Sequence, residues 1–150
     1  MRLLLTILLL SFYLVGFGQS DEDSNNIIGY TCGYGLEESI PVLKIGNKVI
    51  EKDYKGISNL IFNGTGAEKF LSVVVLERLD SLNEYQIDSL ERNQINLIKK
   101  SFEQVYLCWG CTESYRRGLT ELFVPEYLNE ACTWLDRKLK DLEIEKKDDL

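Results

Sequence analysis

Residues 65–79 of the chain read TGAEKFLSVVVLERL, and this stretch decides the fold class. It opens with Thr65 followed three residues later by Glu68, the T-x-x-E form of a capping box, in which each side chain binds an unpaired backbone N–H at the other's position. Apolar residues then occupy nearly every side of the predicted helix, which is typical of a helix at the centre of a core. The run Val73–Val75 also fits a buried strand, but the capping box favours the helix.

Amphipathic patterns before this stretch predict two further short helices. Residues 39–52 fit either a helix that Ser39 caps or a hairpin that turns at Gly46-Asn47, and the apolar spacing favours the helix. Asp53 is the predicted N-cap of the next helix, which ends at Asn63-Gly64. Both interpretations assign this region to packing rather than to chemistry.

Three patterns after residue 79 extend the helical prediction to the end of the chain. Ser81 opens an S-x-x-E signature, and the pattern behind it continues to residue 106, with a kink or a break at the polar residues 91–94. Thr112 is the predicted cap of another helix, and Pro125 begins the last one. The apolar stripe of that last helix consists of Leu128, Cys132, Leu135, Leu139 and Leu142.

Together these patterns predict a mainly α fold. We expect a compact stack of about five to six short helices arranged as α-hairpins, with a general resemblance to helical-repeat modules. The glycine-rich segment 29–35 is not compatible with a helix, so we expect it to form an N-terminal loop that cysteines tie to the stack.

The chain divides into four predicted parts. Residues 1–18 resemble a secretory signal, because their apolar run would span about 20 Å as a helix, against about 30 Å of membrane hydrocarbon. An uncleaved N-terminal anchor is the alternative. We then expect a disordered acidic arm over residues 19–28, a single helical domain over residues 29–145 and a frayed tail over residues 146–150.

Charge and composition exclude several classes of function. Without the signal, which contains Arg2, the chain has 16 basic and 24 acidic residues, a net charge of −8. Such a protein gains nothing from nucleic-acid phosphates or anionic lipid surfaces, so we expect no nucleic-acid partner and no membrane insertion after signal cleavage. The sequence contains no histidine, which removes the commonest general base and the commonest zinc ligand.

Four cysteines are present: Cys32, Cys108, Cys111 and Cys132. An exported chain with an even number of cysteines is expected to form disulfides. We favour Cys108 with Cys111, because the chain already holds them within bonding range, and Cys32 with Cys132, because the last helix can hold the glycine-rich loop. Crossed pairings, in which Cys32 bonds Cys108 or Cys111 and Cys132 takes the other, stay open.

The stretch Cys108-Trp109-Gly110-Cys111 resembles the active-site motif of thioredoxin-like oxidoreductases, in which a helix N-terminus lowers the pKa of the first thiol. The resemblance implies Cys108 as nucleophile and Cys111 as resolving thiol. It is confined to these four residues, because the 39 residues that follow are helical in pattern and Pro125 lies too close to be the family's distant cis-proline. A structural staple is favoured. A zinc site is disfavoured, because only one close cysteine pair exists.

Carboxylates offer a weaker candidate for chemistry. Asp80, Glu84 and Asp88 recur every four residues, and one of two close carboxylates can have a raised pKa and act as an acid. At helical spacing such residues more often form one solvated face, and we favour that interpretation.

We therefore expect an exported, periplasmic or secreted, non-enzymatic module that needs no cofactor and no metal. Its expected partner is a protein or an envelope component, and the acidity of the chain favours a cationic one. The loops near Tyr30, Tyr34 and Trp109 are the candidate contact surface, with Trp109 either a core plug or an exposed anchor. The alternative function is a thiol-disulfide oxidoreductase that uses Cys108 and Cys111.

Overall fold

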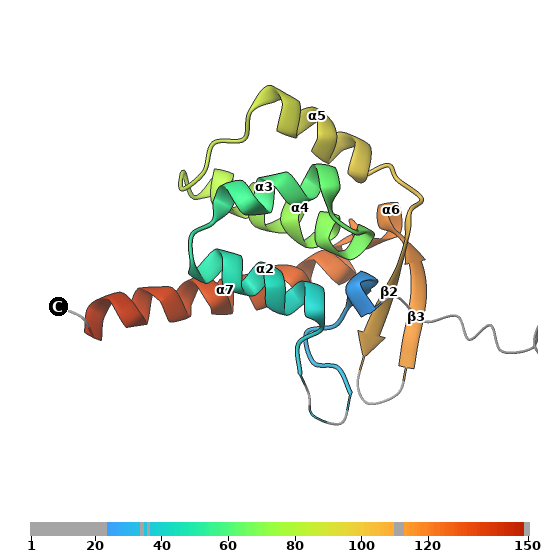
Figure 1. Cartoon of the computed structure of the whole chain (residues 1–150), viewed down its shortest axis with the longest axis horizontal. Helices are drawn as coiled ribbons and strands as arrows, with labels where there is room; N and C mark the ends of the chain where they lie inside the picture. The colour runs from blue at the N-terminus through green and yellow to red at the C-terminus, as the bar shows by residue number, and fades with distance from the viewer. Residues whose placement is uncertain (1–23, 34, 36, 110–112, 149–150) are drawn as a thin grey trace, which may run out of the picture.

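The computed structural model describes residues 24–33, 35, 37–109 and 113–148, and for residues 109, 113 and 142–148 the backbone alone. The predicted signal lies outside these residues. The described chain is mainly helical, with a small three-stranded sheet at one side (Figure 1). In chain order the elements are η1 (Ser24–Asn26), β1 (Ile27–Ile28), α2 (Ile40–Ile50), α3 (Tyr54–Asn63), α4 (Gly66–Ser81), α5 (Ser89–Ile98), β2 (Gln104–Trp109), β3 (Glu113–Gly118), α6 (Leu119–Leu122) and α7 (Pro125–Asp148).

Helix α4 is the centre of the fold, as its sequence predicts. The expected capping box is present: the Thr65 hydroxyl accepts from the Glu68 N–H at 3.3 Å, and the Glu68 carboxylate accepts from the Thr65 N–H at 2.9 Å. Helices α2, α3, α5 and α7 and strand β2 all contact α4. Residues 73–75 are helical and buried, so the strand alternative is wrong.

The two short helices before α4 also form as predicted. Residues 40–50 are the helix α2 rather than a hairpin, with Pro41 in the first turn. Ser39 stands at the N-cap position, but its hydroxyl makes no capping bond and is used elsewhere. Asp53 caps α3, where its carboxylate accepts from the Gly56 N–H at 2.9 Å.

The region after α4 corrects the prediction for Ser81. This residue is the last of α4 rather than the start of a new helix, and Asn83 then turns the chain with a φ of 57°. Helix α5 starts behind Asp88, which forms a second capping box with Glu91. The helix runs without a break through residues 91–94. The D-x-x-E sequence of this box therefore prevails over the S-x-x-E sequence seven residues earlier.

The helix predicted to follow Thr112 is wrong for residues 113–118, which form β3. This strand pairs antiparallel with β2, with Val105 opposite Arg117. Val105 is fully buried, so β2 has a side facing the core, and pairing with it overrides the local helical pattern of β3. The helical conformation resumes only at Leu119.

Residues 24–28, the end of the predicted disordered arm, belong to the fold. The Asn26 side-chain amide accepts from the Ala67 N–H at 2.9 Å and donates to the Gln104 carbonyl at 2.8 Å. It therefore joins the start of α4 to the start of β2. Residues 19–23 lie outside the described part of the chain.

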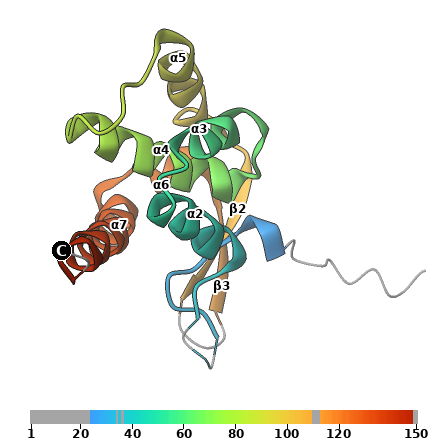
Figure 2. The same cartoon turned by 60° about the vertical axis from the view of Figure 1, so that its left-hand side comes forward.

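Helix α7 begins at Pro125 as predicted and includes residues 146–148, which were expected to fray. Figure 2 looks nearly along α7 and shows it beside α2, a pair in direct contact. The residues that α7 buries most deeply are Ala131, Trp134 and Leu135, whereas Leu128, Cys132 and Leu139 of the predicted stripe are only half-buried. The buried face is therefore rotated toward Trp134.

Both views place the loop over residues 29–39 and one end of the β2–β3 pair at the same end of the molecule, with α5 at the opposite end (Figures 1 and 2). Of the helices in the described part of the chain, none combines the length and the apolar character that a membrane span requires.

Candidate functional site

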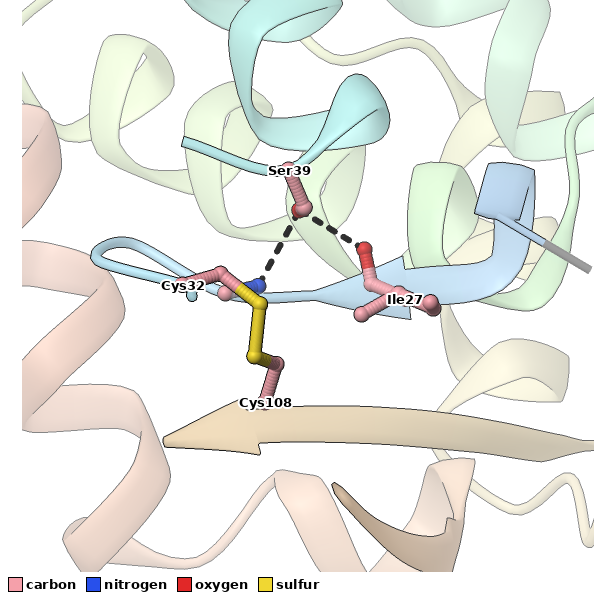
Figure 3. Close-up of a disulfide and its surroundings, with 5 residues drawn as sticks. Ile27, Cys32, Ser39 and Cys108 are labelled. Atoms are coloured by element: carbon pink, nitrogen blue, oxygen red, sulfur yellow. Dashed lines mark hydrogen bonds between the residues drawn. A yellow bond between two sulfur atoms is a disulfide. The ribbon is translucent and has the colours of Figure 1, made fainter. Parts of the chain in front are cut away.

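A disulfide between Cys32 and Cys108 ties the glycine-rich loop to strand β2 (Figure 3). The two Cα atoms are 5.7 Å apart, and the two residues are separated by 76 positions in the sequence. On the chain-entropy estimate, a bridge that closes a loop of this length stabilises the fold by about 4 kcal/mol. We call this region, residues 29–39 with the neighbouring end of the β2–β3 pair, the disulfide end.

The favoured pairing of Cys108 with Cys111 and of Cys32 with Cys132 is wrong. Cys108 bonds Cys32, and Cys132 carries a free thiol. The cause is the sheet, because β1 pairs in parallel with β2 and the chain leaves β1 level with Cys108. Proximity in space therefore outweighs proximity in sequence. Cys111 lies outside the described residues.

Ser39 binds the backbone of Ile27 and Gly29, where the chain leaves β1 and enters the disulfide end. Its hydroxyl donates to the Ile27 carbonyl at 2.8 Å and accepts from the Gly29 N–H at 3.1 Å (Figure 3). The Ser39 backbone N–H donates to the Gly29 carbonyl at 2.9 Å. Glycine suits position 29 because a Cβ there would lie 3.1 Å from the Cβ atoms of both Cys32 and Cys108, closer than most Cβ contacts in proteins. The disulfide thus crosses over a glycine that leaves room for it.

Tyr30 corrects the predicted contact surface. It is only 8 % exposed and belongs to the core, where its ring lies 5.6 Å from that of Trp134. Burial raises the pKa of the Tyr30 hydroxyl, and the nearby Glu130 and Cys132 raise it further. Tyr30 therefore anchors the loop to α7 instead of presenting a side chain to a partner. The sequence signal for this is the alternation of apolar residues at Ile28 and Tyr30.

A second attachment joins the loop to α7 through one acidic residue. Glu38 accepts from the Trp134 indole N–H at 3.0 Å and pairs with the Lys138 ammonium group at 2.9 Å. The disulfide end is consequently fixed on two sides: to β2 by a covalent bond and to α7 by this group.

The other aromatic candidates fall at the margin of the described structure. Tyr34 lies outside the described residues. The backbone of Trp109 is the end of β2, paired with Glu113, and its side chain lies outside the described part. Whether Trp109 points inward or outward therefore stays a prediction.

A small cavity lies beside the disulfide, between β1, β2 and α7. Its volume is about 10 Å³, close to the space that one water molecule requires. Its apolar walls come from Ile28, Phe70, Leu107 and Leu122, and the polar side chains that line it belong to Tyr30, Tyr127 and Glu130. The Tyr30 hydroxyl is buried and has no hydrogen-bond partner among the described residues.

Cys132 is half-buried on α7. Burial raises the pKa of its thiol, Asp136 raises it further, and Arg78 partly opposes them. The thiol is thus protonated at neutral pH and is a poor nucleophile, because the thiolate is the reactive form.

The structure also contains a polar cluster that the sequence did not predict. The Glu91 carboxylate, although only 6 % exposed, accepts hydrogen bonds from the Ser58 hydroxyl, from the Tyr85 hydroxyl at 2.5 Å and from the Asp88 N–H at 2.9 Å. We call these four residues the Glu91 cluster. Its one detectable sequence signal is the D-x-x-E box, which explains Glu91 but not the two hydroxyl donors.

The predicted carboxylate row does not form one solvated helical face. Asp80 lies in α4, Glu84 follows the end of that helix, and Asp88 caps α5. Hydrogen bonds from the Ile87 N–H and from Arg92 hold the pKa of Asp80 below its usual value. These groups connect α4 to α5 and do not lie as a pair poised for acid–base chemistry.

The described residues contain no group of three or more cysteine, aspartate or glutamate side chains placed to hold a metal ion. Comparisons of the chain with protein-family models, with curated proteins and with solved structures found no match.

Proposed function

We propose that this protein is an exported, non-enzymatic binding module and that its disulfide end contacts another protein or an envelope component. The disulfide carries the proposal, because it joins two segments 76 positions apart into one fixed surface. Loops that a rigid scaffold positions are the usual place for recognition. Preorganisation of this kind reduces the ordering entropy that a flexible loop would lose on binding.

The internal contacts of the disulfide end support binding rather than chemistry. Its tyrosine is buried against Trp134, its Cys32 sulfur is bonded, and Glu38 is occupied by Trp134 and Lys138. These side chains make contacts inside the protein that hold the loop in place. The outward positions that remain, such as Thr31 and Glu37, are exposed and suited to contact with a partner.

The charge of the chain supports a cationic partner. The sequence carries a net charge of −7 with the signal included, and Glu37 adds an exposed carboxylate at the disulfide end. Electrostatic attraction of this kind raises the association rate and weakens with salt, because the screening length falls from about 10 Å at 0.1 M to about 3 Å at 1 M.

Site-specific crosslinking tests the location of the contact. A photoreactive amino acid is placed at Glu37 in the disulfide end, and in a matched variant at Leu90, which is 66 % exposed on α5 at the opposite end. We expect a discrete adduct with an exported polypeptide or envelope component from position 37 and none from position 90. Equal labelling at both positions, or labelling at position 90 alone, would contradict the proposal.

A charge reversal tests the electrostatic part with the partner recovered in this way. Glu37→Lys should weaken association at low salt, and the difference should vanish near 1 M salt. Glu51→Lys changes an equally exposed carboxylate at the end of α2 and serves as the matched control. Affinity that does not change with salt would refute the cationic partner while leaving the contact surface intact.

The alternative function, thiol-disulfide exchange, requires a different bond at the same sulfur. The Cys111 thiolate would attack the Cys108 sulfur, form the Cys108–Cys111 bond and release Cys32 as a thiolate, so that no external oxidant is needed. The observation that favours it is that Cys108 is only half-buried. Peptide mapping across a series of glutathione buffers tests this exchange. If the Cys32–Cys108 bridge is reduced to four free thiols and no Cys108–Cys111 bridge is found in any buffer, the exchange is excluded.

A further inference from the structure

We propose that the cavity beside the disulfide is a binding site for one ordered water molecule, to which the Tyr30 hydroxyl donates a hydrogen bond. Two independent observations meet there. The Tyr30 hydroxyl is buried without a partner among the residues that the structure describes, and Tyr30 lines a cavity of about 10 Å³, the space of a single water.

The energetics of the hydroxyl favour an occupied site. A buried hydroxyl without a partner has lost its hydrogen bonds to solvent and regained none, which lowers the folding equilibrium constant by about tenfold. Native proteins rarely tolerate this, and a buried water with two to four polar partners is the usual solution. Tyr30 is held in place by Trp134 and by the disulfide two residues further on, so the ring cannot swing out to reach bulk solvent.

The side of the cavity that belongs to α7 provides a second partner for the water. Glu130 lines the cavity, and it lies close enough to the Tyr30 hydroxyl to be the largest electrostatic contribution to its raised pKa. A carboxylate has about four acceptor positions, so Glu130 can accept from a water in addition to its contacts within the protein. The water then accepts from Tyr30 and donates to Glu130, which links the loop to α7.

The size and walls of the cavity set the class of ligand. Its lining is mainly apolar, and an apolar cavity of this size with no polar group would stay dry. The polar groups at one side are what make hydration favourable. A volume of about 10 Å³ excludes any organic ligand and admits one water.

Three deletions of a hydroxyl group, compared in urea unfolding of the oxidised chain, test the proposal. Tyr85→Phe removes a hydroxyl that donates to Glu91. Ser72→Ala removes a buried hydroxyl that has no partner in the described structure and does not line this cavity. The first should lower the folding equilibrium constant by about fivefold, and the second should leave it unchanged or raise it. We expect Tyr30→Phe to behave like Tyr85→Phe.

The opposite result would overturn the proposal. If Tyr30→Phe leaves the folding equilibrium constant unchanged or raises it, as Ser72→Ala is expected to do, the Tyr30 hydroxyl has no partner to lose. The comparison does not depend on the absolute stability of the chain, because each variant differs from the wild type by one oxygen atom.

A crystal structure at high resolution provides a direct second measurement. We expect a density peak in the cavity at about 2.7–2.8 Å from the Tyr30 hydroxyl oxygen, the usual O–H···O distance. The same peak should be lost or displaced in Tyr30→Phe crystals. An empty cavity in the wild type, or a peak outside hydrogen-bond distance of Tyr30, would refute the assignment.

Discussion

The Glu91 cluster and the disulfide end bury polar groups in opposite ways. Glu91 is almost fully buried, yet donors from α3, from the α4–α5 connection and from its own capping box bind its carboxylate. Tyr30 is equally buried, and within the described part of the chain its hydroxyl has no donor or acceptor. Hydrogen bonds therefore hold the Glu91 cluster, whereas a disulfide, aromatic packing and the contacts of Glu38 to α7 hold the disulfide end.

The difference follows from the lengths of chain that each region joins. The members of the Glu91 cluster are within 33 positions of one another, so helix caps and turns can place them. The disulfide end joins residues up to 100 positions apart, such as Glu38 and Lys138. Helix caps and turns cannot span such separations, so the disulfide, together with the contacts of Glu38 to Trp134 and Lys138, links the distant segments there.

Removal of the disulfide should be the largest single effect. The double variant Cys32→Ser with Cys108→Ser should lose about 4 kcal/mol of unfolding free energy, because the unfolded chain regains the freedom of a 76-residue loop. Urea unfolding followed by far-ultraviolet circular dichroism measures this, and reduction of the wild type should reproduce it. Cys132→Ser is the control, with a change of about 1 kcal/mol or less. A double variant as stable as this control would show that the noncovalent contacts hold the region without the disulfide.

Truncation of Glu91 should come next. Glu91→Ala leaves the hydroxyls of Ser58 and Tyr85 and the Asp88 N–H without their acceptor and should cost about 3 kcal/mol in urea unfolding. Glu84→Ala removes an exposed carboxylate that accepts a hydrogen bond from the Tyr54 hydroxyl, and it should lower the unfolding free energy by well under about 1 kcal/mol. Equal losses in the two variants would mean that burial of the cluster contributes nothing.

A methyl group at Gly29 should have an intermediate effect. Gly29→Ala places a Cβ 3.1 Å from both cysteine Cβ atoms, and the strain should cost about 2 kcal/mol and slow formation of the disulfide on refolding. At Gly35 the nearest atoms belong to the flexible Glu37 side chain, so Gly35→Ala should be close to neutral. Mass spectrometry measures the rate of disulfide formation, and a wild-type rate in Gly29→Ala would contradict a steric role for Gly29 beside the disulfide.

The smallest effect should be a difference in pH response. The pKa of Asp80 is lowered in the fold, so its contribution is present at neutral pH and is lost as the pH falls below the ordinary value of 3.8. Asp80→Asn should flatten the acid side of a stability profile. The pKa of Tyr30 is raised, so stability should fall as the pH rises above 10.0, and Tyr30→Phe should flatten the alkaline side alone. Unfolding midpoints across the pH range measure both; unchanged slopes in the variants would contradict these assignments.

Sequence patterns predict the helices well where the deciding interactions are local. The box at Thr65, the cap at Asp53 and the helix start at Pro125 concern residues within one turn and are confirmed. The helix predicted from Ser81 to residue 106 is wrong at both ends, because α5 spans Ser89–Ile98 and residues 104–106 belong to β2. The structure places α4 at the centre because its apolar residues surround the whole helix. The fold class follows from these elements.

The disulfide end could not be predicted in the same way. Residues 113–118 become a strand because β2 offers them a partner, and Cys108 meets Cys32 because β1 pairs with β2. Both pairings depend on register between distant segments, which no local pattern encodes. The burial of Tyr30 depends on the same register, and so its predicted role as a surface contact failed.

We expect the parallel pairing of β1 with β2 to form late when the molecule folds. Contacts among α2, α3 and α4 join neighbouring segments, whereas β1 and β2 join residue 27 to residue 106. Non-local pairings form late, because the entropy of closing the loop must be lost before any contact is gained. The two thiols meet only after that closure. The rate at which the two free thiols are lost during refolding therefore measures how quickly β1 pairs with β2.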